Sequence, residues 1–185
     1  TEPYLTYHRT SPTGEMLQVE PITVKGATMV HDFNITRNHV VFMDLPVVWD
    51  FEGMESSGLP VVWDESYGAR LGVMPRNGTD ADVRWFDINP CYVFHPMNAY
   101  EEGNKIILDV CRMETAMKPG VNSPPQLYRW VIDLDKGTVS ESQTDDRTVD
   151  FTRICDTRVG LKNRYGYGAA FGGGMPVAVG FLKYD

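Results

Sequence analysis

Cysteine is scarce in this sequence, and no cysteines are grouped in a metal-binding pattern. Only three occur, Cys91, Cys111 and Cys155, and they stand at long spacings without a CxxC pair. An odd number at such spacings argues against a disulfide scaffold or a zinc knuckle. Because free thiols are typical of a reducing compartment, we expect a cytoplasmic protein.

Long apolar runs and basic clusters are also missing. No stretch reaches the roughly 18 apolar residues that a membrane helix requires, and the N-terminus has no basic-then-apolar signal pattern. We expect no membrane span, while contact with a membrane surface stays open. The 25 acidic residues outnumber the 17 Lys and Arg, for a net charge of −8. Without clustered positive charge, we expect no nucleic-acid partner.

Helical periodicity is absent as well. Apolar residues do not keep a period of about 3.6 over any stretch of about ten residues, whereas strand-like segments recur with turn signals between them. This pattern predicts one all-β domain, with a sandwich, barrel or propeller as candidates. We predict hairpins that turn near Ser11–Gly14, Thr36–Asn38, Asn77–Gly78, Gly103–Asn104 and Asp135–Gly137.

One hexapeptide, LPVVWD, occurs twice, at residues 45–50 and 59–64. The copies stand too close together for successive propeller blades, so we interpret them as local similarity in a linker. The longest irregular stretches are Asp50–Glu65 and Thr115–Pro125. Loops of this kind on a β scaffold are where substrate pockets tend to form.

Four histidines are the candidates for metal binding. His31, in TMVHDFNIT, and His95, in YVFHPMNAY, each stand in a predicted strand between bulky apolar neighbours. His39 and His8 adjoin predicted turns, so both are expected to be solvated. An isolated strand histidine is most often structural, and no HExxH spacing is present. A nucleophile is not evident either, since the sequence has no GxSxG elbow.

Four segments of the chain together resemble the carotenoid cleavage oxygenase family, which includes carotenoid, apocarotenoid and lignostilbene dioxygenases. They are TMVHDFNITRNHVVFMDLP, YGARLGVMPR, VRWFDINPCYVFHPMNAYEEGNKIILDVCR and VDFTRICDTRVGLKNRYGYGAAF. The segments follow one another in the family's order and span the chain from about Pro21 to Phe171.

The resemblance implies a seven-bladed β-propeller, of which residues 1–185 would form a partial domain. In this family one Fe(II) is bound by four histidines on the propeller axis. Two of them match His31 and His95, and the other two would lie outside this chain. The chain begins at Thr1 without a methionine, which also favours an internal piece of a longer protein.

Around the iron, the resemblance implies supporting residues. Asp150 stands where the family places a glutamate that hydrogen bonds to a ligating histidine. Because aspartate is one methylene shorter, the contact would need a bridging water or a shift of the backbone. Phe33, Tyr92 and Phe94 flank the two histidines and are expected either to line an apolar substrate tunnel or to pack in the core.

The implied function is iron-dependent cleavage of a conjugated carbon–carbon double bond by O2, which gives two carbonyl products. The expected partners are an apolar alkene, either a carotenoid, an apocarotenoid or a stilbene, and O2. One alternative is an iron-dependent isomerase or hydrolase of the same family. Another is a truncated propeller without activity, because two of four ligands would bind the metal far more weakly.

Overall fold

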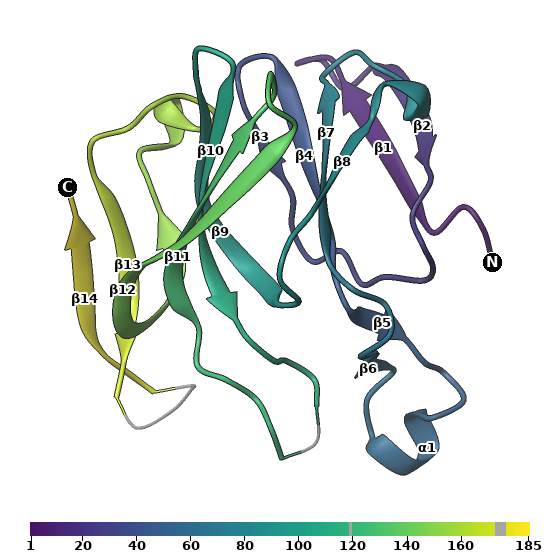
Figure 1. Cartoon of the computed structure of the whole chain (residues 1–185), viewed down its shortest axis with the longest axis vertical. Coiled ribbons are helices and arrows are strands. Elements are labelled where there is room, and N and C mark those ends of the chain that lie inside the picture. The colour runs from purple at the N-terminus through teal and green to yellow at the C-terminus, as the bar shows by residue number, and fades with distance from the viewer. Residues whose placement is uncertain (119, 173–176) are drawn as a thin grey trace.

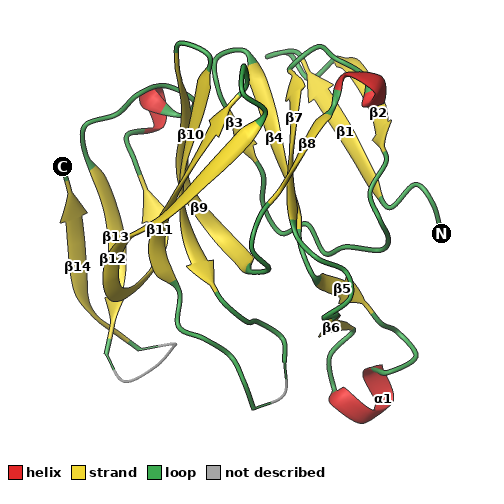
Figure 2. Ribbon diagram, in the orientation of Figure 1, coloured by secondary structure: helices red, strands yellow, loops and turns green. Residues whose placement is uncertain are grey.

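The computed structural model describes residues 1–118, 120–172 and 177–185. Strands dominate it, so the prediction of an all-β chain is confirmed (Figures 1 and 2). The strands are β1 (Leu5–Thr10), β2 (Met16–Ile22), β3 (Asn34–Ile35), β4 (His39–Asp44), β5 (Val47–Trp49), β6 (Val61–Trp63), β7 (Arg70–Pro75), β8 (Arg84–Asp87), β9 (Tyr92–Glu102), β10 (Lys105–Met113), β11 (Gln126–Asp133), β12 (Thr138–Arg153), β13 (Gly166–Phe171) and β14 (Ala178–Tyr184).

Helical structure within the described ranges is limited to single turns. A four-residue helix, α1 (Met54–Ser57), and two 3-10 helices, Asp80–Asp82 and Asp156–Arg158, are present. None of the helices in the described part of the chain has the length and apolar character needed to cross a membrane.

The strands form antiparallel sheets that follow one another in chain order, as Figure 1 shows from the N-terminus to the C-terminus. One sheet has the order β3-β4-β7-β8, and the next has the order β9-β10-β11-β12 and continues into β13 and β14. The first strands of successive sheets meet, because β9 contacts both β3 and β12. This arrangement is that of neighbouring propeller blades with their inner strands side by side.

Strand β12 belongs to two of these sheets. Its first part, Thr138–Gln143, pairs with β11, whereas Val149 and the residues after it pair with β13. One continuous strand therefore completes the β9-β10-β11 sheet and begins the sheet that contains β13 and β14. Asp150 lies just beyond the point where the strand changes partner.

The predicted hairpins form at the expected turns. β1–β2, β3–β4, β9–β10 and β11–β12 are antiparallel pairs. Gly103 and Gly137 adopt positive φ angles of 59° and 68°, which glycine accepts without a steric penalty. The turn predicted at Asn77–Gly78 is wider than expected, because a 3-10 helix intervenes before β8.

The two copies of LPVVWD pair with each other. β5 and β6 run antiparallel, with Val47 opposite Trp63 and Trp49 opposite Val61. The pair and α1 form an arm that projects from the sheets at the bottom of Figure 1, here named the β5–β6 arm (residues 47–63). The expectation that Asp50–Glu65 is irregular is wrong in part, because this stretch contains α1 and β6. The repeated valines and tryptophans favour extended pairing.

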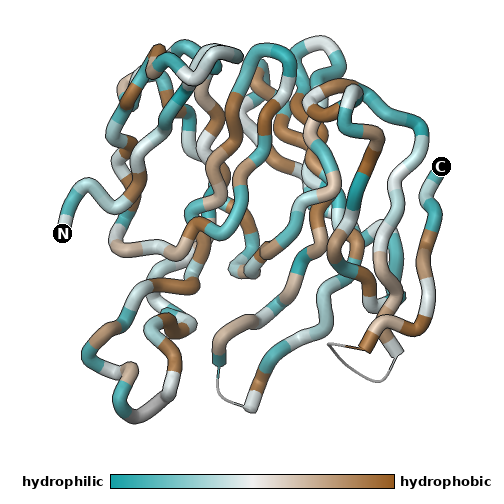
Figure 3. Tube along the Cα trace, turned by 180° about the vertical axis from the view of Figure 1, so that it is seen from behind, coloured by the Kyte–Doolittle hydropathy of each residue, from teal (hydrophilic) through white to brown (hydrophobic). Residues whose placement is uncertain are grey.

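The main core lies between the sheets, where Figure 3 shows apolar residues along the central strands. Trp130, Leu108 and Ile132 have no exposed surface, and Tyr92 is 1% exposed. Since each strand alternates its side chains between two faces, inward residues of β9, β10 and β11 meet those of β4 and β7. Strand β9, which carries His95, is therefore packed into this core.

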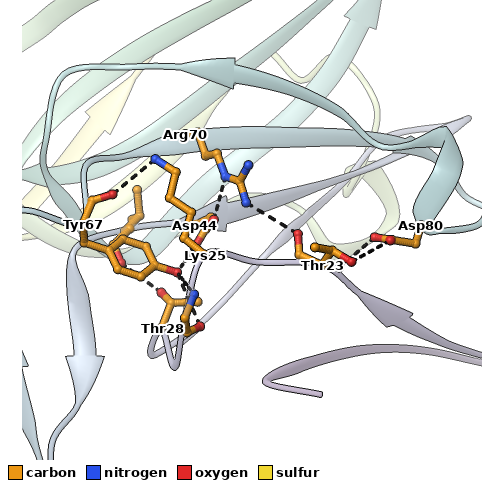
Figure 4. Close-up of polar contacts among 9 residues, drawn as sticks. Thr23, Lys25, Thr28, Asp44, Tyr67, Arg70 and Asp80 are labelled. Atoms are coloured by element: carbon orange, nitrogen blue, oxygen red, sulfur yellow. Dashed lines mark hydrogen bonds and ion pairs between the residues drawn. The ribbon is translucent and has the colours of Figure 1, made fainter. Parts of the chain in front are cut away.

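A polar network holds the connection between β2 and β3 (Figure 4). The buried carboxylate of Asp44 accepts hydrogen bonds from Tyr67 Oη at 2.6 Å and from Arg70 Nε at 2.7 Å. Lys25 Nζ donates to the carbonyl oxygen of Tyr67 at 3.2 Å. Burial and the Asp44 carboxylate both raise the pKa of Tyr67, so its hydroxyl stays a donor. The network fixes the start of the segment that leads to His31.

Removing the Tyr67 hydroxyl is expected to destabilise the protein. Tyr67→Phe leaves the buried Asp44 carboxylate with one donor fewer, and a hydrogen bond to a charged group contributes about 1.5–3 kcal/mol. Urea unfolding followed by circular dichroism measures the loss. The control is Tyr4→Phe, because Tyr4 is 43% exposed. Equal unfolding free energies for the two variants would contradict the role given to this network.

Candidate metal centre

His95 is the fourth residue of β9, the edge strand of its sheet. Proline is tolerated on an edge strand because no ladder hydrogen bond is lost there. The pairing of β9 with β10 shifts register on both sides of Pro96: Asp109 faces Asn98, whereas Val110 faces Pro96. Irregularities of this kind re-aim side chains next to functional sites. The sequence HP therefore sets the local course of the strand that carries His95.

His31 lies in an irregular segment, and its predicted place inside a strand is wrong. β3 begins only at Asn34, and an isolated bridge between Thr28 and Val48 is the last ladder contact before His31. The side chain of Asp32 accepts the backbone N–H of Phe33 at 2.7 Å. Aspartate competes with ladder pairing through such local hydrogen bonds, which the alternating apolar pattern does not reveal.

The two histidines nevertheless face each other. Their ring centroids lie 5.3 Å apart, and the ring planes are nearly perpendicular, at 89°. The His31 ring is exposed and, within the described ranges, makes ring contacts but no hydrogen bond. Both of its nitrogens therefore remain free to bind.

Asp150 contacts His95 directly. Its Oδ1 lies 2.9 Å from His95 Nδ1 and also accepts the backbone N–H of Phe151 at 2.8 Å. Since Oδ1 accepts from the amide, we assign the proton between the two side chains to Nδ1, which leaves His95 Nε2 with a free lone pair. The bridging-water alternative is not needed in this geometry.

A β-bulge explains how the short aspartate reaches the ring. From Asp150 to Arg153, β12 advances three positions while β13 advances two, from Ala169 to Tyr167. Phe151 takes a positive φ of 52° in this bulge, a conformation that costs a non-glycine residue about 1–3 kcal/mol. The bulge therefore lies directly beside the carboxylate that contacts His95.

Aromatic rings surround the histidine pair. Phe94 lies 5.3 Å from the His31 ring and 4.8 Å from the Tyr92 ring, measured between centroids. Phe151, which was not selected from the sequence, lies 4.6 Å from the His95 ring and is 52% exposed. Phe33 is 44% exposed, whereas Tyr92 is buried and donates its hydroxyl to the carbonyl oxygen of Met29 at 2.8 Å. A tunnel-lining role for Phe33, Tyr92 and Phe94 stays a prediction.

The other two histidines lie away from this pair. His8 is exposed on β1, as expected. His39 is half-buried, and its Nδ1 lies 2.9 Å from Glu101 Oε1, so the expectation of a solvated side chain is wrong. Burial alone raises the pKa of Glu101, but hydrogen bonds from Thr36, His39 and Asn38 outweigh it and lower the pKa to about 2. The cluster around Glu101 was missed because its members are far apart in the sequence.

A cavity of about 310 Å³ adjoins the site. It is lined by the segment after His31, by the part of β9 after His95, by the end of β12 and by the second 3-10 helix. Its lining residues are Asp32, Phe33, Asn34, Ile35, Pro96, Met97, Asn98, Ala99, Thr152, Arg153, Ile154, Asp156 and Val159.

The donors present fit part of an iron site. Neutral imidazole suits ferrous iron, and His31 and His95 supply two such donors with accessible nitrogens. In the described part of the chain, no three His, Cys, Asp or Glu side chains gather where they would hold a metal ion. Burial raises the pKa of Cys111 to about 12, so its thiol is protonated in the metal-free chain. Among the residues that the structure describes, His31 and His95 are therefore the two side chains that fit a ferrous ion.

Several known proteins are similar to this chain in sequence. The chain is 36% identical to a carotenoid cleavage oxygenase of Mycobacterium tuberculosis over 90% of its own length and 43% of that protein. It is 36% identical to a carotenoid 9,10(9',10')-cleavage dioxygenase of Crocus sativus, over 100% and 36% of the two chains. Isoeugenol monooxygenase of Pseudomonas putida is 35% identical over 77% of this chain and 32% of its own. The chain therefore spans less than half the length of the curated relatives it matches.

Solved structures show the same fold. The lignostilbene dioxygenase of Pseudomonas brassicacearum superposes with a TM-score of 0.79 at 28% identity, over 92% of this chain and 38% of that one. Cobalt-substituted Synechocystis ACO, an apocarotenoid oxygenase, superposes with a TM-score of 0.81 at 25% identity, over 97% and 41%. The predicted partial propeller is confirmed. Because the family model of RPE65, retinal pigment epithelial membrane protein, also matches residues 1–185, the chain belongs to the carotenoid cleavage oxygenase family that includes RPE65.

Proposed function

We propose that the protein containing this chain is a non-haem Fe(II) dioxygenase. It cleaves one conjugated carbon–carbon double bond of a carotenoid, apocarotenoid or stilbene with O2. One oxygen atom ends on each former alkene carbon, so the products are two carbonyl compounds. One observation carries the proposal: the His31 and His95 rings face each other at 5.3 Å, with His95 Nε2 left free by the Asp150 contact. The names of the relatives on carotenoid, lignostilbene and isoeugenol substrates support it.

His31 and His95 would hold the metal through ring nitrogens, with two further histidines from flanking sequence. Bound Fe(II) would supply the activation of O2. Asp150 holds the proton on His95 Nδ1 and thereby fixes the tautomer that presents Nε2 to the metal. The negative charge of Asp150 also makes the His95 imidazole more basic, so that Nε2 is a stronger ligand for the metal.

The aromatic side chains would position the alkene and exclude water. Phe94 packs against His31, and Phe151 packs against His95, so apolar rings flank the pair on two sides. Both rings and the exposed Phe33 offer a flat apolar surface that suits a planar polyene or a stilbene. Tyr92 supports Phe94 from behind, at 4.8 Å between ring centroids.

Product analysis under O2 and under argon tests the reaction. The polypeptide, with whatever sequence flanks residues 1–185, is loaded with Fe(II) and given an apocarotenoid or a stilbene in the presence of isotopically labelled O2. The expected result is two carbonyl products that carry the label, with no conversion under argon. Conversion that proceeds equally under argon would instead identify an isomerase or hydrolase and overturn the dioxygenase assignment.

A further inference from the structure

β9 holds the segment that contains His31 at two points, one toward each end of the strand. Tyr92, the first residue of β9, donates its hydroxyl to the carbonyl oxygen of Met29 at 2.8 Å. Met29 lies two residues before His31, and its own N–H donates to the carbonyl oxygen of Val47 at 2.8 Å. The phenol is 1% exposed, and burial raises the pKa of Tyr92, so the hydroxyl stays protonated as a donor.

The second point is Glu101, near the other end of β9. Its Oε1 accepts the backbone N–H of Asn38 at 2.9 Å and the hydroxyl of Thr36, and its Oε2 accepts Asn38 Nδ2 at 2.7 Å. His39 Nδ1 also lies 2.9 Å from Oε1. One carboxylate thus gathers the entire turn between β3 and β4. The turn begins directly after the short strand that follows His31.

Between these two points the His31 segment has little support of its own. β3 contributes only Asn34 and Ile35 to a ladder, and that ladder joins it to β4 rather than to β9. The polar contacts that join the segment's flanks to the strand bearing His95 therefore come from Tyr92 and Glu101. His95 lies between them on the same strand. The position of β9 therefore determines where both His95 and the His31 segment lie.

We propose that Tyr92 and Glu101 are positioning residues that together fix His31 relative to His95. The proposal rests on the proposed function, because it assigns the spacing a purpose in metal binding. Metal ligands must be held within about 0.5 Å of their productive geometry by supporting contacts. An irregular segment anchored on both sides meets this need, whereas one anchored on a single side swings about the remaining point. Loss of either anchor therefore removes most of the benefit of the other.

The test uses Tyr92→Phe, Glu101→Gln and the double variant in the polypeptide as its gene encodes it. Tyr92→Phe deletes one hydroxyl, and Glu101→Gln places an amide N–H₂ group among donors. Controls remove the same groups elsewhere: Tyr184→Phe loses a hydrogen bond to Asp145, and Glu102→Gln loses an ion pair with Lys162. Co²⁺ affinity is measured by competition with a chelator, and the visible spectrum of the Co²⁺ complex reports ligand geometry. Circular dichroism confirms that each variant is folded.

Each single variant is expected to lose about tenfold in Co²⁺ affinity, with an altered Co²⁺ spectrum, while the controls match the wild type. The double variant is expected to lose less than the product of the single losses, since both anchors hold one segment. Glu101→Asp, which keeps the carboxylate, should recover most of the affinity. If Glu101→Gln fails to fold, Tyr92→Phe and its control test the loss of an anchor.

If Tyr92→Phe and Glu101→Gln keep the wild-type affinity and spectrum, the positioning role of the two residues is overturned, while the proposed metal site is unaffected. Strictly multiplicative losses would overturn the shared action of the two residues. A wild-type protein that binds no Co²⁺, or one whose affinity survives His95→Ala, would overturn the proposed function and this inference with it. The two failures are therefore distinguishable by the wild type and the His95 variant alone.

Discussion

His95→Ala is expected to abolish iron binding and turnover in the polypeptide that contains this chain. The substitution removes one of the two imidazoles that face each other and also removes one hydrogen-bond partner of the buried Asp150 carboxylate. Loss of a supporting partner alone costs about 10–100-fold in metal affinity, so loss of a ligand should exceed that range. The metal content of the purified protein and the rate of alkene cleavage measure the effect.

His8→Ala is the matched control for this experiment. His8 is exposed on β1 and takes no part in the site, so iron content and rate should equal those of the wild type. His39→Ala should remain close to the wild type as well, because Glu101 keeps its hydrogen bonds from Thr36 and Asn38. Equal losses in the His8 and His95 variants would refute the assignment of the metal centre.

Asp150→Asn is expected to lower metal affinity by about 10–100-fold with the fold intact. Asparagine has nearly the same shape, and its oxygen still accepts from Phe151 and His95. What disappears is the negative charge that fixes the imidazole tautomer and strengthens its donor nitrogen. Metal competition titrations measure the affinity, and thermal unfolding of the metal-free protein shows whether the substitution acts on folding instead.

Two further variants separate charge from position. Asp156→Asn removes an exposed carboxylate on the neighbouring 3-10 helix, where it pairs with Arg153, and should leave metal affinity unchanged. Asp150→Glu adds a methylene to a site that is only 3% exposed. Because it keeps the charge, it should nevertheless retain more metal affinity than Asp150→Asn. If Asp150→Asn and Asp150→Glu both bind metal as tightly as the wild type does, Asp150 has no part in the site.

The hairpins are predictable because their causes are local. Glycine at Gly103 and Gly137 supplies the positive φ that these turns require, and the aromatic and β-branched residues of the adjoining segments favour strands. The irregular course around His31 is not predictable in this way. Its alternating pattern matches a strand, but the hydrogen bond from the Phe33 amide to Asp32 replaces ladder pairing.

The site shows the same division. His31, His95 and Asp150 were selected from sequence because each stands in a segment that resembles a known family. The bulge at Phe151 depends on the register between β12 and β13, and the Glu101 cluster depends on how β9 meets the β3–β4 turn. Both arise from packing between distant segments, so no local pattern announces them.

The passage of β12 from one sheet to the next has a consequence for cooperativity. The strand that closes the sheet holding His95 also delivers Asp150 to that histidine from the following sheet. Neither sheet can open locally without disturbing the carboxylate, so fluctuations of two structural units are joined at one residue. Bound metal would then raise the free energy needed to open either sheet, and the two sheets would open together.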